Sequence, residues 1–106
     1  MTLDEQWRRI RFPKGELESG AMGRFFIDSL MPAIEDLGQH VDLSTVAIFE
    51  VDDSRGGKYL YFSPGAFAAL FTLASEHGAQ PCDRPAPEGL SLAYGDEWAA
   101  RKLLAG

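Results

Sequence analysis

The fold is decided by residues 45–63, which read TVAIFEVD (45–52), DSRGG (53–57) and KYLYFS (58–63). The first and last runs are rich in β-branched and aromatic residues, and the five residues between them favour a turn. This stretch predicts a β-hairpin with strands over 45–52 and 58–63. Ser63 then suits a helix N-cap, Pro64 the first helical position and Gly78 the position after the end. A strongly apolar helix is therefore predicted over 64–77.

Upstream of the hairpin, the sequence predicts another helix over residues 21–37. Gly38 follows it as a C-terminal cap, and residues 15–20 before it form a polar connection. Pro32 lies inside the helix and predicts a kink, or two short helices that meet near Ser29. The apolar residues that recur every four positions along it are Met22, Phe26, Leu30 and Ile34.

The two ends of the chain complete the predicted layout. Residues 7–12 alternate and carry cations, which is typical of an edge strand, so residues 1–20 are predicted to form an arm or an edge strand. Residues 79–89 contain three prolines and predict an irregular loop. Residues 90–94 alternate and predict a further strand. Asp96 then caps a last helix that carries Trp98.

These elements predict an α+β fold with one domain over residues 1–106. We expect a two-layer sandwich in which a mainly antiparallel sheet packs against helices 21–37 and 64–77. Three strands are predicted over 45–52, 58–63 and 90–94, with residues 7–12 as an optional fourth, and the last helix lies at an edge.

Charge and hydropathy restrict the classes of function. The net charge of −6 and the pI near 4.7 disfavour a nucleic-acid binder. Four cations do gather near the amino terminus, at Arg8, Arg9, Arg11 and Lys14, but a solvated strand explains them more simply. The chain has no membrane-spanning run and no secretory signal, and one cysteine fits a reducing compartment, so a cytoplasmic location is expected.

No convincing catalytic or metal site stands out. Cys82 adjoins Asp83, which disfavours a thiolate, and it lacks the spacing of a known cysteine motif. His40 and His77 are far from each other and from Cys82, so no zinc pattern arises. Three acids gather near the hairpin turn, at Glu50, Asp52 and Asp53, with Asp42 nearby in the sequence, and acids at turns more often cap amides. We therefore predict no catalytic residue, no metal and no cofactor.

The leading hypothesis is a small acidic, non-enzymatic protein-binding module, such as an adaptor, a chaperone-like protein or an inhibitor. Its predicted binding residues are Tyr59, Tyr61 and Trp98, because aromatic residues concentrate at interface hot spots. The partner is another protein or a second copy of the chain, since helix 64–77 has more apolar residues than one face needs. The alternative is a small enzyme or ligand-binding domain that uses the hairpin acids with a histidine, or the loop around Cys82.

Overall fold

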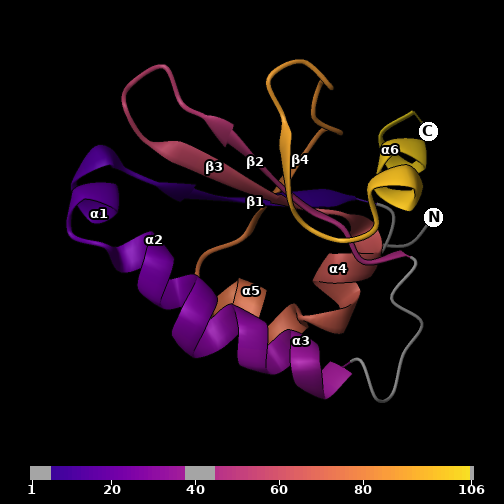
Figure 1. The fold of residues 1–106 in the computed structure, drawn as a ribbon, viewed down its shortest axis with the longest axis horizontal. Helices are drawn as coiled ribbons and strands as arrows, with labels where there is room; N and C mark the ends of the chain where they lie inside the picture. The colour runs from indigo at the N-terminus through magenta and orange to yellow at the C-terminus, as the bar shows by residue number, and fades with distance from the viewer. Residues whose placement is uncertain (1–5, 38–44, 106) are drawn as a thin grey trace.

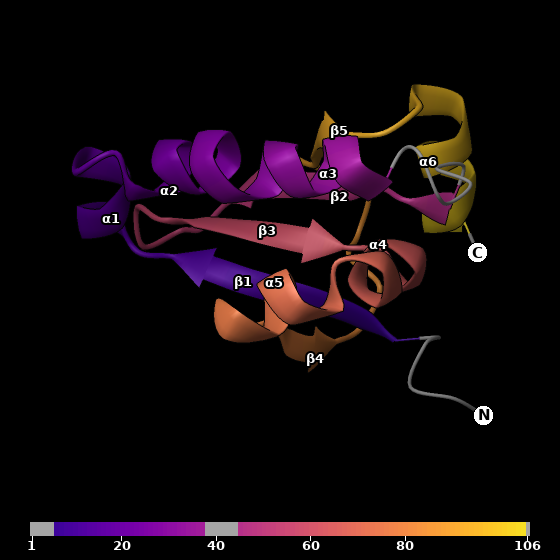
Figure 2. The ribbon, with the colours of Figure 1, turned by 90° about the horizontal axis from the view of Figure 1, so that it is seen from below.

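The computed structural model describes residues 6–37 and 45–105, and these form an α+β fold built on one antiparallel sheet. The α+β prediction is confirmed, but the described sheet has five strands instead of three or four. Figure 2 shows their order across the sheet, β4-β1-β3-β2-β5. The strands are β1 (Trp7–Phe12), β2 (Ile48–Asp52), β3 (Lys58–Phe62), β4 (Gln80–Cys82) and β5 (Ser91–Tyr94).

Helices cover one face of the sheet along its length and the other face at one end (Figure 1). Among the described helices, α6 alone covers the second face, so the predicted two-layer sandwich is incomplete as a description. The helical segments are α1 (Lys14–Glu18), α2 (Ala21–Arg24), η2 (Phe25–Leu30), α3 (Met31–Leu37), α4 (Pro64–Ala69), α5 (Phe71–Glu76) and α6 (Glu97–Ala105).

The first four strands and their helices follow the order β-α-β-β-α-β, the split βαβ motif, to which β5 and α6 are added. Two predictions were wrong here. Residues 7–12 do form the optional strand that the sequence predicts, but they are not an arm or an edge strand, because β1 pairs with both β3 and β4. Residues 79–89 are not all loop, because residues 80–82 supply the edge strand β4.

Strand β1 lies in the interior because it pairs with a neighbour along each of its two edges, and both of its faces contribute to a core. Ile10 and Phe12 join the core beneath the helices, whereas Trp7 lies on the opposite face in a second core with Phe49 and α6. An interior strand covered on both sides does not show the simple alternation of a half-exposed one. Arg9 and Arg11 lie on the same face as Trp7, so the sequence did not indicate that one end of this face belongs to a core.

The helix predicted over 21–37 is continuous, and the break predicted near Ser29 is absent. Its turns widen over η2, where i→i+5 hydrogen bonds replace the usual pattern just before Pro32. Such a wide turn accommodates the missing N–H and the bulk of the proline ring. A short helix, α1, also occupies part of the predicted polar connection 15–20.

The helix predicted over 64–77 is instead interrupted at Leu70 and forms α4 and α5. Leu70 and Ala74 are buried in the core, whereas Phe71 remains 58% exposed. The interruption thus divides an almost wholly apolar segment between the core and the surface.

Ser63 connects the hairpin to α4. Its hydroxyl accepts hydrogen bonds from the backbone N–H of Ala47 (3.1 Å) and of Ala66 (3.2 Å), and donates to the carbonyl oxygen of Thr45 (2.9 Å). The backbone segments at Thr45 and Gly65 lie so close together that a Cβ atom at Gly65 would be 2.5 Å from the carbonyl oxygen of Thr45. Ser63 itself is fully buried, so water cannot replace its contacts.

We expect Ser63→Ala to lower the free energy of unfolding by about 1–3 kcal/mol, because the buried amide of Ala47 loses its side-chain acceptor and α4 loses its cap. Urea denaturation measures this loss. Ser75→Ala, at an exposed helical serine, is the matched control and should change stability by less than about 0.5 kcal/mol. Equal stability of the two variants would contradict this role of Ser63.

Candidate functional site

The part of the sheet that α6 leaves uncovered carries tyrosine and arginine side chains from the two central strands. Arg9 of β1 is paired with Tyr61 of β3, and Arg11 with Tyr59, so the four side chains share one face. We call these four residues the Arg–Tyr face. The guanidinium carbon of Arg9 lies 4.7 Å from the centre of the Tyr59 ring, and the two tyrosine rings are 6.1 Å apart. Both tyrosines are half-buried.

Ion pairs and a hydrogen bond made by Arg11 and Arg55 hold the side chains at the edge of this face in place. The Asp53 carboxylate pairs with Arg11 Nε at 2.8 Å and with Arg55 Nε at 3.3 Å, and the terminal nitrogen of Arg55 donates to the Tyr59 hydroxyl at 3.1 Å. The hydrogen bond from Arg11 is the main cause that lowers the pKa of Asp53. A side-chain hydrogen bond with Tyr61 is the main cause that raises the pKa of Arg9.

Among the described residues, the hairpin acids pair with cations. Asp53 is held by two arginines, while Glu50 and Asp52 both lie near Lys58 Nζ, at 3.1 Å and 3.8 Å. The ring of His77 lies 4.5 Å from that of Phe25 and forms no ion pair with these acids. His40 and Asp42 lie outside the described residues. Within residues 6–37 and 45–105, no cluster of three or more potential metal ligands forms.

The lowered pKa of Asp53 predicts a pH-dependent contribution to stability. An acid whose pKa is lower in the folded state stabilises the fold above its unfolded pKa, about 4, and loses this effect as the pH falls through the folded pKa. We expect Asp53→Asn to be less stable than the parent chain at neutral pH, and the difference to shrink progressively below about pH 4.

Urea denaturation over a pH series checks this prediction, with Asp52→Asn as the control because that carboxylate is 85% exposed and 3.8 Å from its partner. The control should lose less stability at neutral pH. A deficit of Asp53→Asn that stays constant down to strongly acidic pH would contradict the assignment to this carboxylate.

The structure does not bring the predicted binding residue Trp98 together with the tyrosines. Trp98 lies on α6, is 69% exposed, and has Lys102 Nζ 3.6 Å from its ring centre. Among the described residues, its ring stacks on neither Tyr59 nor Tyr61. The role of all three in binding stays a prediction.

The four amino-terminal cations are also divided. Arg8 is buried beneath the helices, 4.4 Å above the Phe67 ring, whereas Arg9 and Arg11 lie on the opposite face. Lys14 lies on α1, where its Nζ atom is 3.8 Å from Oε1 of Glu18. A run of cations in the sequence is therefore not one basic patch in space.

Cys82 of β4 is half-buried next to the α6 core, and this burial is the main cause that raises the pKa of its thiol. Arg9 opposes the increase and Asp83 adds to it. The sequence identified Asp83 but not the larger effect of burial, which depends on how α6 packs. A protonated, half-buried thiol is a poor nucleophile.

We expect iodoacetamide to alkylate Cys82 more slowly than it alkylates N-acetylcysteine at about pH 7.5, because less thiolate is present. Mass spectrometry follows the rate, and the same chain unfolded in guanidinium chloride is the control, in which the rate should rise toward that of the free thiol. A folded-state rate above that of N-acetylcysteine would show an activated cysteine instead.

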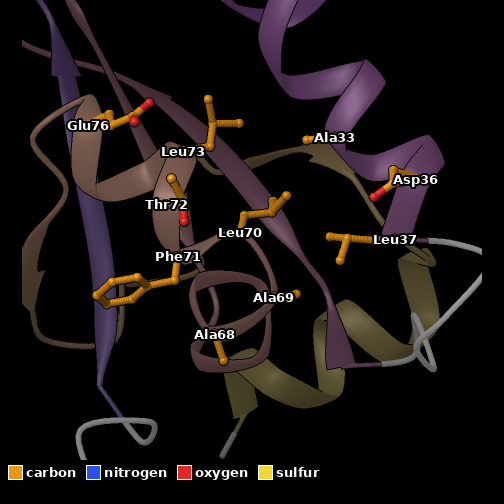
Figure 3. Close-up of a pocket in the computed structure, with 10 residues that line it drawn as sticks. All are labelled: Ala33, Asp36, Leu37, Ala68, Ala69, Leu70, Phe71, Thr72, Leu73 and Glu76. Atoms are coloured by element: carbon orange, nitrogen blue, oxygen red, sulfur yellow. The ribbon is translucent and has the colours of Figure 1, made fainter.

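A groove between α3 and the α4–α5 pair is the site that sequence reasoning missed (Figure 3). We call it the interhelical groove. Its volume is about 450 Å³, and Leu37 and Leu70 point toward each other from its two walls. Among the described residues, its charged lining residues are two acids, Asp36 and Glu76. The described lining is Ala33, Asp36, Leu37, Ala68, Ala69, Leu70, Phe71, Thr72, Leu73 and Glu76.

One sequence signal did point to this groove: the excess of apolar residues in segment 64–77. That excess indicated a second contact surface, but the position of α3 opposite α4–α5 is a result of tertiary packing. Among the described residues, neither Asp36 nor Glu76 forms an ion pair. The groove thus combines an apolar floor with two uncompensated negative charges.

Comparison of the chain with protein-family models, with curated proteins and with solved structures gives no match. Within the described residues, no helix is long and apolar enough to cross a membrane. The split βαβ order occurs with many activities and indicates none by itself.

Proposed function

We propose that this chain is a non-enzymatic protein-binding module, and that its docking surface is the interhelical groove. The partner presents a basic, apolar segment such as an amphipathic helix. The observation that supports this proposal is the composition of the groove, where seven of the ten described lining residues are apolar and the two charged ones are acids.

The apolar part of the groove supplies the contact. Docking the apolar side of a helix into a groove between helices is a common mode of peptide recognition, driven by burial of the anchoring side chains. Phe71 lies at the rim of the α4–α5 wall, 58% exposed, with its ring turned away from α3 (Figure 3), and it makes an edge-to-face contact with Phe67, whose ring centre is 5.3 Å away. A large aromatic side chain with restricted motion is a typical hot spot.

The acidic part of the groove selects the charge of the partner. Asp36 belongs to α3 and Glu76 to α5, so a bound segment would meet a carboxylate from each wall. Charges at the rim of an interface favour partners of opposite sign and accelerate their association. The net charge of −6 acts in the same direction at longer range. Together these charges favour a basic segment over an acidic one.

The test uses two synthetic amphipathic helices with the same leucine face, one with lysine and the other with glutamate on its polar face, followed by fluorescence anisotropy. We expect the lysine peptide to bind and the glutamate peptide to bind at least about tenfold more weakly. Phe71→Ser should weaken binding of the lysine peptide about tenfold through loss of an anchor, and Asp36→Lys several-fold through charge reversal.

Two variants outside the groove are matched controls. Ile27→Ser replaces an apolar side chain that is 72% exposed, and Glu35→Lys reverses the acid next to Asp36. Both should bind the lysine peptide like the parent chain. Equal effects of the groove and control variants would refute the groove as the docking surface. A dimer in light scattering that Phe71→Ser dissociates would make a second copy, and not a basic partner, the occupant.

A further inference from the structure

A second hollow lies where the Arg–Tyr face meets the edge strand β4, and it has the opposite charge to the interhelical groove. Its volume is about 370 Å³, within the range of small-molecule pockets. Within residues 6–37 and 45–105, no carboxylate lines it. The lining residues are Arg9, Arg11, Tyr59, His77, Gly78, Gln80 and Pro81.

Positive charge is in excess around this hollow. The carboxylate of Asp53 is shared by Arg11 and Arg55, and Arg9 pairs with no carboxylate among the described residues. Of the two guanidinium groups in the described lining, that of Arg11 shares one carboxylate with Arg55 and that of Arg9 has none, so positive charge exceeds negative charge there. The whole chain has a net charge of −6, so a local excess of positive charge is opposite in sign to the rest of the surface. Such an excess favours binding of an anion at this hollow.

The donors are held in place before any ligand arrives. Arg9 lies against the Tyr59 ring, and the Tyr59 hydroxyl accepts a hydrogen bond from Arg55, so its own proton is available for donation. Arg11 contacts Asp53 through Nε, which leaves its terminal N–H groups for another acceptor. Side chains that are already ordered lose little entropy on binding.

We propose that this hollow binds the phosphate group of a small phosphorylated compound, with Arg9 and Arg11 as charged donors and the Tyr59 hydroxyl as a neutral one. A phosphate monoester carries a charge of about −1.5 to −2 at neutral pH and three acceptor oxygens, which suit two guanidinium groups and one hydroxyl as donors. An extended polyanion suits the site less well, because the acidic remainder of the chain would repel it.

The test is a titration of the ¹⁵N-labelled chain with phenyl phosphate, inorganic phosphate, an acidic peptide and a ten-nucleotide single-stranded DNA, followed by NMR. We expect phenyl phosphate to shift the amide signals of Arg9, Arg11 and Gln80 saturably, and to bind more tightly than inorganic phosphate. Arg9→Gln, at an exposed position, should weaken binding about tenfold while preserving the dispersed spectrum of the folded chain.

Arg101→Gln is the control, because Arg101 lies on α6 and pairs with Glu97 away from the hollow. It should bind phenyl phosphate like the parent chain, and Arg9→Lys should retain more affinity than Arg9→Gln. Absence of saturable shifts, or equal affinity of Arg9→Gln and the parent, would overturn the site. Tighter binding of the DNA or of the acidic peptide than of phenyl phosphate would overturn the assignment to a small phosphorylated ligand.

Discussion

The hydroxyl group of Ser63 is the contact on which the arrangement of the fold depends. It lies at the end of β3, caps α4 and binds the backbone just before β2, so one buried side chain fixes both the hairpin and the direction of the helix that follows. That direction places α4–α5 under the sheet and beside α3. The interhelical groove exists because these two helical segments are held side by side without closing completely.

The alternation of β1 and β3 distributes the polar and apolar groups between the two faces. Beneath the helices, Ile10 and Leu60 are paired neighbours in the core, while one residue away Arg9 and Tyr61 are paired on the opposite face. Because α6 covers only one end of that opposite face, the arginines and tyrosines at the other end remain accessible. The same sheet therefore supports an apolar, acidic groove on one side and a cationic hollow on the other.

The hairpin itself was predictable from local sequence, as were the α+β class and the helical character of 21–37 and 64–77. β-branched and aromatic runs, a serine–proline helix start and a four-residue apolar repeat are local signals that need no knowledge of distant contacts. The position of residues 7–12 was not predictable in the same way. A strand lies in the interior only if partners arrive on both of its edges, and here the second partner, β4, comes from a proline-rich segment some seventy residues away in the chain.

The candidate sites divide in the same manner. The sequence by itself determined their chemical composition: the tyrosine pair, the cations near the amino terminus, the acidic balance and the apolar excess of 64–77. Only the tertiary structure decided which of these groups meet. It separated Arg8 from Arg9, engaged the hairpin acids with cations, buried Cys82, and placed Asp36 and Glu76 on opposite walls of one groove. The reason is physical, because local propensity acts over a few residues, whereas a binding surface forms from segments that packing brings together.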